Sequence, residues 1–345
     1  MIPEKVREVL KKQHYGIVGK HSAVQVCRWT KKSIRDEGIC YKEKFYGIKS
    51  HLCCQMTPAV MWCPNKCLHC WRAVELTIGD KLGKGIDSPK EIIDGCIEAQ
   101  KKLLIGFKKS REKRNLSRAN MEKWEEAQEP MQFAISLSGE PFIYDKIGGL
   151  IEELRKRGKT SFLVTNGLYP EKIKELAEKK QLPTQLYISV NSPNKEMYDK
   201  FHRSSMKNAW EKLNESLEIM SELSCRTTPD RVGLKEVVHR DSSKGTSTRG
   251  IFRMNLVKDL NMNNIKEYAE LIKKASPMFV EVKGFMSVGF ARQRLGYDRM
   301  PSHEEIVEFS KKLAKETGLK ILDEKEESRV VLLGKSREGM MIRKL

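Results

Sequence analysis

The chain has 345 residues, of which 39% are hydrophobic, so it can bury the core of one large α/β domain or of two smaller ones. No apolar run reaches the ~20 residues that a membrane-spanning helix needs, and the charged start of the chain lacks the apolar core of a signal peptide. We therefore expect a cytoplasmic protein with no membrane partner, and the net charge of +19 favours a polyanionic partner such as nucleic acid over a merely Lys-rich surface.

The first 54 residues are rich in cysteine. Seven of the nine cysteines lie between positions 27 and 70, a clustering that indicates metal or redox chemistry in a cytoplasmic chain. Cys27, Cys40 and Cys53 are spaced 13 and 13 residues apart, and Cys54 is adjacent. This pattern predicts an iron–sulfur cluster additional to the one described next, and the even spacing favours Cys53 over Cys54. The alternative is that some of these residues are ordinary buried thiols.

A buried strand predicted at Gln55–Trp62 is followed by a C-x3-C-x2-C loop made by Cys63, Cys67 and Cys70. Three thiolates at this spacing can cover one face of a four-iron cluster and leave one iron open to a small molecule. A structural zinc site normally has a fourth ligand nearby, and His69 would have to fold back to provide it. The spacing favours the cluster over zinc or unligated thiols.

Short apolar runs and amphipathic segments then alternate along the chain. The further predicted strands are Gln132–Leu137, Ser161–Thr165, Leu186–Val190, Phe252–Val257 and Phe279–Lys283. The predicted helices are Pro89–Phe107, Ile147–Arg157, Glu171–Lys179, Ala209–Leu223, Ile265–Lys274 and His303–Thr317. Successive strand–helix units imply parallel strands with right-handed crossovers. The expected fold is α/β, a partial or complete parallel (βα) TIM-like barrel with functional residues at the carboxyl ends of its strands.

Three regions depart from this alternation, namely residues 1–54, 108–128 and 226–250. The chain as a whole divides as follows. Residues 1–54 form an N-terminal extension that carries the additional cysteines, residues 55–323 form the barrel, and residues 324–345 form a C-terminal tail. Within the barrel, Lys108–Gln128 is highly charged and is interpreted as a solvated insertion. The segment Arg226–Gly250 is rich in Ser, Thr and Gly and is interpreted as a surface loop.

Small polar residues stand where several predicted strands end. In the segment after the second strand, Gly139 lets the backbone approach a ligand closely, and Glu140 offers a carboxylate to an ammonium group. Other small polar groups at strand ends suit contacts with a ribose or a carboxylate, although turn formation also explains them. These residues are Ser138, Thr165, Asn166, Ser189 and Asn191.

The cysteine loop resembles the signature of radical S-adenosylmethionine (SAM) enzymes. The segment Ser138–Pro141 is similar to the Gly-Gly-Glu motif of that superfamily, with Ser138 in place of the first glycine. The resemblance implies a barrel of the radical SAM type and a [4Fe-4S] cluster whose open iron chelates SAM. It also implies that the polar residues at the strand ends contact SAM and that SAM cleavage yields a 5′-deoxyadenosyl radical.

Further segments resemble the archaeal tRNA 4-demethylwyosine synthases. They are residues 40–48, 50–51, 63–72, 134–141 and 279–283. This resemblance implies an enzyme that condenses pyruvate carbons with N1-methylguanosine next to the anticodon of tRNA-Phe. It also implies two [4Fe-4S] clusters, the second held by Cys27, Cys40 and Cys53. The alternative is another radical SAM enzyme that modifies a different RNA or a peptide.

The same resemblance suggests how the substrates are held. Lys42 matches a lysine that forms a Schiff base with pyruvate; the alternatives are pyruvate on the open iron of the second cluster or a merely solvated lysine. We expect an external electron donor of the flavodoxin or ferredoxin type, since the chain has no length for a flavodoxin-like domain. We also expect a monomer. The residues proposed to contact the tRNA are Arg203, Arg292, Arg294, Arg299 and the run 108–118. Those proposed to hold the methylguanine, although packing also explains each, are Phe45, Tyr46, Trp71 and Arg72.

Overall fold

The protein structure, a computed structural model, describes residues 1–107, 119–225 and 247–342, and its contacts divide the chain into two compact units. Unit 1 comprises Met1–Trp62, Ile78–Leu163 and Met340–Leu345, and unit 2 comprises Cys63–Thr77 and Val164–Gly339. Within the described ranges, no helix combines the length and the apolar character that crossing a bilayer requires.

Unit 1 is built on a mixed sheet. Its strands are β1 (Gly16–Val18), β2 (Ser22–Gln25), β3 (Cys53–Thr57), β4 (Gln132–Ile135) and β5 (Thr160–Thr165), the last of which runs across the boundary between the units. The pairings β1–β2 and β2–β3 are antiparallel, whereas β3–β4 and β4–β5 are parallel. Parallel pairing brings the carboxyl ends of β3 and β4 to the same edge of the sheet.

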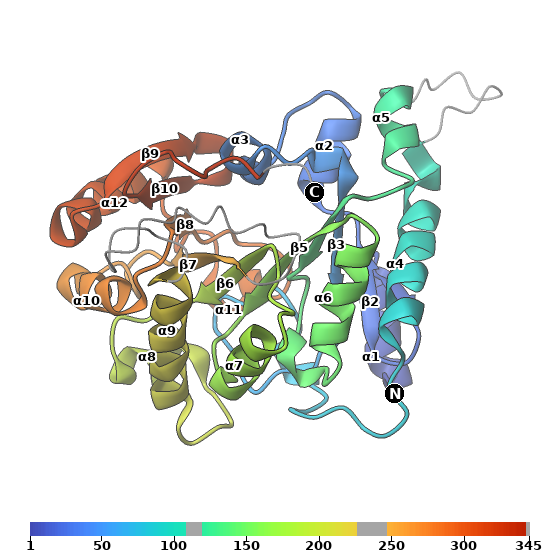
Figure 1. Ribbon diagram of the computed structural model, residues 1–345, viewed down its shortest axis with the longest axis horizontal. Coiled ribbons are helices and arrows are strands. Elements are labelled where there is room, and N and C mark those ends of the chain that lie inside the picture. Colours follow the sequence, from blue (N-terminus) through green and yellow to red (C-terminus); the bar gives the residue numbers. More distant parts are fainter. Residues whose placement is uncertain (108–118, 226–246, 343–345) are drawn as a thin grey trace. The chain divides into compact units, whose positions relative to one another are not determined.

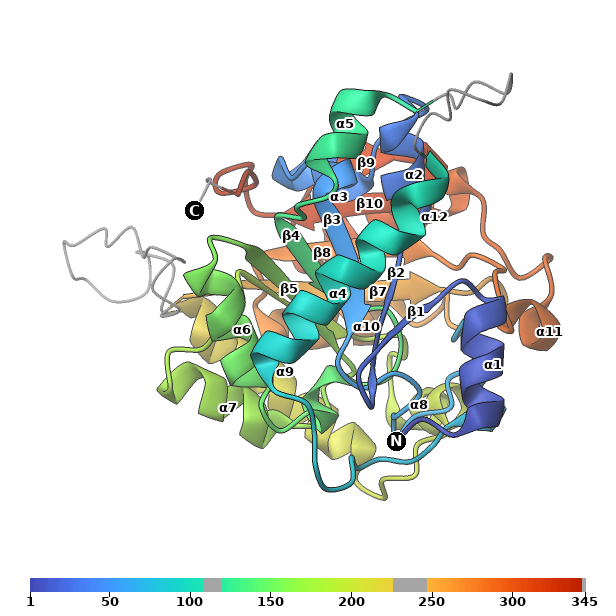
Figure 2. The same cartoon turned by 90° about the vertical axis from the view of Figure 1, so that its right-hand side faces the viewer.

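The helices of unit 1 are α1 (Glu4–Lys12), α2 (Arg28–Ile34), α3 (Tyr41–Tyr46), α4 (Pro89–Leu104), α5 (Met121–Glu126) and α6 (Ile147–Lys156). Helix α4 begins at a capping box in which Ser88 and Glu91 satisfy each other's backbone N–H groups, with Pro89 in the first turn. Its buried face packs on β1, β2 and β3, and Figure 2 shows it lying across β3. Figure 1 shows α4 and α6 side by side.

Unit 2 repeats the alternation of strands and helices. Its strands are β6 (Gln185–Ser189), β7 (Arg249–Leu256), β8 (Phe279–Gly284), β9 (Lys320–Lys325) and β10 (Val330–Gly334). The pairings β6–β7 and β7–β8 are parallel, and β10 lies antiparallel between β8 and β9. Its helices are α7 (Pro170–Glu178), α8 (Lys195–His202), α9 (Ala209–Cys225), α10 (Ile265–Ala275), α11 (Ala291–Leu295) and α12 (His303–Thr317). Helices α7, α9, α10 and α12 pack in succession, and the first three can be followed in Figure 1.

The predicted strands and helices are present, with differences at some ends. Helix α12 spans the predicted His303–Thr317, because a capping box at Ser302 starts it and Gly318 in the left-handed conformation ends it. The first barrel strand, predicted at Gln55–Trp62, runs from Cys53 to Thr57 instead. Pro58 explains this end, because a proline has no N–H to donate to a strand ladder.

The regions predicted outside the regular alternation also contain strands and helices. The extension at residues 1–54 contains the β1–β2 hairpin that pairs with β3. The tail predicted at residues 324–345 contains β10, all five residues of which are buried. Of the loop predicted at Arg226–Gly250, residues 226–246 lie outside the described part of the chain, and Arg249 and Gly250 belong to β7. The insertion at Lys108–Gln128 includes α5, whereas residues 108–118 lie outside the described part of the chain.

Candidate functional site

The three-cysteine loop lies in unit 2, where its sulfur atoms are near one another. Burial raises the pKa of the Cys67 thiol, and the neighbouring Cys70 and Cys63 thiols raise it further. The Cys63 sulfur accepts hydrogen bonds from the Asn65 backbone N–H at 3.4 Å and from the Asn166 side-chain amide at 3.9 Å. The Cys63 and Cys70 thiols thus both lie near Cys67.

A buried guanidinium supports this loop from within. Arg72 is 2% exposed and donates to the Asn65 carbonyl at 2.5 Å and to the Thr77 hydroxyl at 2.9 Å. Burial by itself lowers the pKa of Arg72, but the Cys63, Cys70 and Cys67 thiols outweigh that effect and raise it. A buried cation beside three sulfurs favours their thiolate forms, which are the forms that bind metal.

Two further arginines hold the loop by its carbonyl groups. Arg294 donates to the backbone carbonyls of Leu68, Cys70 and Arg72, and its guanidinium also pairs with Glu75. Arg203 donates twice to the Lys66 carbonyl, at 3.0 and 2.7 Å. Both arginines were predicted to contact RNA, and in the structure their guanidinium groups brace the cysteine loop.

Two buried histidines complete these surroundings. Nδ1 of His202, the last residue of α8, lies 3.0 Å from the Cys67 sulfur. The ring of His69 stacks on Phe201 with centroids 4.9 Å apart. Burial lowers the pKa of both histidines to about 3, so both are neutral at physiological pH.

The donor set suits a cluster with several irons better than a single ion. Among the residues that the structure describes, no three Cys, His, Asp or Glu side chains are close enough together to hold one metal ion. A [4Fe-4S] cluster takes each thiolate on a separate iron, so its ligands stand farther apart than those of one ion. Three converging thiols beside a buried cation fit such a cluster.

The second group of cysteines lies in unit 1. Cys27 and Cys40 are the N-cap residues of α2 and α3, and their sulfurs accept backbone N–H groups from Thr30 and Lys42 at 3.5 Å each. The pKa of the Cys53 thiol is raised by burial and then by the Cys27 thiol, with Cys40 adding to the effect. The Cys27 and Cys40 thiols therefore both lie near Cys53.

Cys54 points to the other side of β3. Successive side chains of a strand face opposite sides of the sheet. Burial raises the pKa of Cys54, as does the nearby Cys96 thiol of α4. Cys54 is fully buried, and its surroundings differ from those of Cys53.

Lys42 lies close to the second group of cysteines. Its charge lowers the pKa of Cys53, against the larger effect of burial. Its Nζ is 4.9 Å from the centroid of the Phe162 ring, a contact that holds the amine over a fully buried side chain of β5. The first turn of α3 thus carries both Cys40 at its cap and the candidate nucleophile.

The Ser138–Pro141 segment follows β4 in unit 1. The backbone N–H of Glu140 donates to the Trp62 carbonyl at 2.8 Å, and its buried carboxylate accepts from the Phe142 backbone N–H at 3.1 Å. Among the described residues, the buried hydroxyl oxygen of Ser138 has no hydrogen-bond partner. An unsatisfied buried hydroxyl is costly, so this group is suited to a ligand contact.

Gly139 cannot be replaced without strain. Its φ is +76°, and a Cβ there would stand 1.9 Å from the Ala59 carbonyl oxygen. We expect Gly139→Ala to lower the free energy of unfolding by more than Gly158→Ala, for which left-handed strain alone predicts about 1–2 kcal/mol. Gly158 is the matched control, with φ +66° and nothing within 4 Å of the added Cβ. Urea denaturation measures both losses, and equal losses would mean that the Ala59 carbonyl moves aside at little cost.

Thr165 and Asn166 support the turn that follows β5. The Thr165 hydroxyl accepts from the Gly167 N–H, and the Asn166 side-chain oxygen accepts from the Leu168 N–H, each at 3.1 Å. This is the turn chemistry that small polar residues provide. The Asn166 amide also donates to the Cys63 sulfur, so this residue belongs to the surroundings of the cysteine loop.

Ser189 and Asn191 stand at the end of β6. Ser189 is partly buried and pairs with Arg253 of β7. Asn191 is buried, and its side-chain oxygen accepts from the Asn255 N–H at 2.9 Å while its carbonyl accepts from the Asn261 amide at 2.7 Å. Asn191 therefore joins the ends of β6 and β7, a structural role that the sequence did not indicate.

Three of the residues proposed to hold the methylguanine are in the interior. Phe45 and Tyr46 are fully buried, and Arg72 is engaged by the cysteine loop. The sequence also missed His202 and the bracing role of Arg294, because neither stands near the motif in the chain. Their contacts with the loop span 135 to 226 residues, beyond any local pattern.

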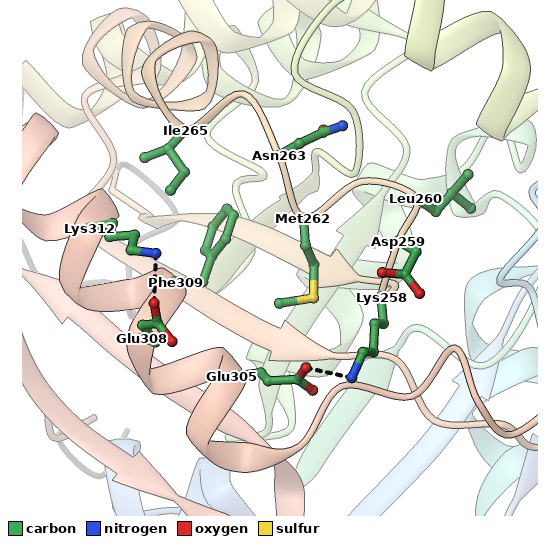
Figure 3. Close-up of a pocket in the computed structure, with 10 residues that line it drawn as sticks. All are labelled: Lys258, Asp259, Leu260, Met262, Asn263, Ile265, Glu305, Glu308, Phe309 and Lys312. Atoms are coloured by element: carbon green, nitrogen blue, oxygen red, sulfur yellow. Dashed lines mark ion pairs between the residues drawn. The ribbon is translucent and has the colours of Figure 1, made fainter.

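A cavity of about 290 Å³ lies elsewhere in unit 2, beside α10 and α12 (Figure 3). Two ion pairs, Lys258–Glu305 and Lys312–Glu308, line it with N–O distances of 2.6 Å. None of the residues that the sequence singled out lines this cavity.

Two family models and several known proteins match this chain. The family model described as "Radical SAM superfamily" matches residues 58–241, and "Wyosine base formation" matches residues 274–335. The SAM-dependent tRNA 4-demethylwyosine synthase of Pyrococcus abyssi is 44% identical over 333 residues, 96% of this chain and 89% of that protein. Its counterpart in Methanocaldococcus jannaschii is 33% identical over 337 residues, 96% of each chain. The enzyme of that name in Schizosaccharomyces pombe is 36% identical over 89% of this chain and 40% of its own length.

Solved structures are similar over nearly the whole chain. "Structure of TYW1 with a lysine-pyruvate adduct bound" gives a TM-score of 0.80 at 33% identity, covering 99% of this chain and 98% of that one. "Crystal structure of archaeal TYW1" gives 0.74 at 29% identity, covering 99% and 100%. The predicted α/β fold, a partial parallel barrel of the radical SAM type, is confirmed.

Proposed function

We propose that this chain, which belongs to the tRNA 4-demethylwyosine synthase family of radical SAM enzymes, condenses pyruvate carbons with N1-methylguanosine next to the anticodon of tRNA-Phe. The single observation that best supports this activity is the presence of two separate groups of neighbouring cysteine thiols, one of them beside Lys42. A second candidate activity has no comparable support.

The [4Fe-4S] cluster and SAM of this family together supply a 5′-deoxyadenosyl radical when bound. Cys63, Cys67 and Cys70 hold the cluster, and Asn166 donates to one of its ligand sulfurs. Glu140 and Ser138 follow β4, where Gly139 permits the close turn that a ligand contact requires. Their buried polar groups bind the polar part of SAM, and Thr165, Ser189 and Asn191 shape the strand ends that contact the rest.

Residues 1–54 provide the ligands of a second cluster in this proposal, residues 55–323 the barrel and residues 324–345 the tail. Cys27, Cys40 and Cys53 are the second set of ligands. One serine links the loops that carry them: the Ser50 hydroxyl accepts from the Cys40 N–H at 2.8 Å, and its carbonyl accepts from the Thr30 hydroxyl at 3.0 Å. The backbone N–H of Thr30 in turn donates to the Cys27 sulfur. These hydrogen bonds position Cys27 and Cys40 in the metal-free chain.

The choice between Cys53 and Cys54 can be tested by counting iron. After anaerobic reconstitution, the wild-type chain should hold about eight irons and Cys53→Ala about four, because only one [4Fe-4S] cluster remains. Cys54→Ala, the adjacent control, should stay near the wild-type value, since Cys54 faces Cys96 on the other side of β3. Iron lost from Cys54→Ala and retained by Cys53→Ala would reverse the assignment.

Pyruvate is bound as a Schiff base on Lys42. The amine lies over Phe162 and beside the second group of cysteines, so a substrate attached to it stands at the second cluster. The lysine–pyruvate adduct described for a structure 33% identical to this chain supports covalent binding. An external one-electron donor of the flavodoxin or ferredoxin type, a monomeric state and a cytoplasmic location stay predictions.

Unit 2 carries an exposed contact surface for the tRNA beside the cysteine loop. The Arg292 guanidinium lies 4.9 Å from the centroid of the Tyr297 ring, and both side chains are exposed. Splayed bases of RNA loops stack on aromatic and guanidinium planes. The backbone N–H of Phe290, just before this pair, donates to the Trp71 carbonyl at 2.9 Å.

Salt dependence tests this contact. For a footprint of about 5–8 phosphates, log Kd should change with log salt with a slope of about 4–6 in magnitude, at ~0.7 per phosphate of single-stranded RNA. Arg292→Glu should reduce the slope, whereas Lys315→Glu changes the net charge equally on the exposed side of α12 and should leave it nearly unchanged. Equal effects would assign the affinity to overall charge and not to Arg292. Fluorescence anisotropy with labelled tRNA-Phe measures both.

The activity itself can be tested with purified components. Reconstituted chain, SAM, pyruvate and a chemical reductant should convert N1-methylguanosine in tRNA-Phe to 4-demethylwyosine, detected by mass spectrometry of the nucleosides. The same tRNA with unmodified guanosine at that position should yield no product, because it lacks the methyl group that becomes part of the new ring. Cleavage of SAM without change to the methylguanosine would favour the alternative, a different RNA or a peptide.

A further inference from the structure

The carboxyl end of α8 is fixed to the three-cysteine loop by its backbone. The Lys66 N–H donates to the His202 carbonyl at 2.9 Å, and the Leu68 N–H donates to the Phe201 carbonyl at 3.0 Å. Arg203, in the left-handed conformation at the C-cap of α8, returns two hydrogen bonds to the Lys66 carbonyl. The loop and the helix end therefore hold His202 in one place.

The side chain of His202 makes one hydrogen-bond contact in the described part of the chain. Its Nδ1 lies 3.0 Å from the Cys67 sulfur, and the Tyr198 ring covers the imidazole with centroids 4.4 Å apart. Within the described residues, Nε2 of His202 is buried and has no hydrogen-bond partner.

The tautomer follows from these surroundings. A neutral imidazole carries one N–H, and burying that N–H without an acceptor would be costly. The proton therefore belongs on Nδ1, where the sulfur accepts it. Once Cys67 binds iron, its sulfur has lost its own proton and can only accept, so the direction of this hydrogen bond is determined.

We propose that His202 is a positioning residue that donates a hydrogen bond to the Cys67 ligand sulfur and thereby raises the reduction potential of the cluster. This inference rests on the cluster ligands of the proposed function. Reduction adds negative charge to the cluster and its sulfurs, and an N–H donor stabilises that charge more in the reduced form than in the oxidised form. The effect is large in a buried site, where water does not screen it.

The test compares the redox equilibrium of variants of the full chain. At the wild-type midpoint potential, His202→Phe should lower the ratio of reduced to oxidised cluster about three- to tenfold, the change that one hydrogen bond typically contributes. A tenfold change corresponds to about 59 mV for a one-electron couple. His202→Asn should restore most of the ratio, because its amide nitrogen can take the place of Nδ1. Electron paramagnetic resonance measures the reduced cluster, and the spectral change on adding SAM identifies the cluster that binds it.

His303→Phe is the matched control, because His303 is a largely buried histidine of unit 2 that stands next to Glu324 instead of a cysteine. It should leave the ratio unchanged. Equal ratios in wild type, His202→Phe and His202→Asn would overturn the inference, and so would equal shifts in both His202 variants, which would assign the effect to packing. If the wild-type chain has no SAM-sensitive signal, the cluster ligands are wrong and the inference fails with them. A shifted ratio without tRNA product would support His202 and count against the proposed function alone.

Discussion

Cys67→Ala is expected to abolish the release of 5′-deoxyadenosine from SAM. Three thiolates are the fewest that can hold a [4Fe-4S] cluster with one open iron, and Cys67 is the middle ligand of the loop. It is also the sulfur next to His202, and its burial among the Cys63 and Cys70 thiols leaves no other group to replace it among the described cysteines. Chromatography of the reaction mixture after anaerobic reconstitution measures the loss.

Cys96→Ala is the control for this change. Cys96 is fully buried on the apolar face of α4, and its thiol has a raised pKa because of burial alone. Its removal should cost stability through a small cavity while SAM is still cleaved. Full cleavage by Cys67→Ala would contradict the ligand assignment, whereas loss of cleavage in both variants would show that the assay reports folding and not ligation.

Lys42→Arg is expected to lose the tricyclic product as completely as Lys42→Ala. Arginine keeps the positive charge over Phe162 but cannot form an imine with pyruvate. In the wild-type chain, borohydride added with pyruvate should trap an adduct on the peptide that contains Lys42. Peptide mass spectrometry locates the adduct, and nucleoside mass spectrometry measures the product.

Lys44→Ala provides the matched control for Lys42, because it removes an exposed lysine from the same helix. The adduct and the product should both persist in this variant. Substantial product from Lys42→Arg would be incompatible with a Schiff base at this residue. Pyruvate bound to the open iron of the second cluster would then be the better account.

The alternation of strands and helices could be predicted because it depends on local periodicity. Helix α12 was predicted to the residue, since its capping box and its terminal glycine are sequence-local features. Strand β10 was missed because a short apolar run near the end of a chain does not reveal its partners. Its place between β8 and β9 depends on strands that precede it by up to about 50 residues.

Residue spacing within short segments was enough to predict the radical SAM chemistry. The spacing of Cys63, Cys67 and Cys70 lies within one loop, and the motif around Gly139 within four residues, so both are visible without a fold. Which groups surround these motifs depends on the tertiary structure. It placed Cys53 and Cys54 on opposite sides of β3, bonded Arg294 to the carbonyls of the cysteine loop, and brought His202 to the Cys67 sulfur. The physical reason is that burial and hydrogen bonding depend on packing between distant segments, which residue spacing along the chain does not encode.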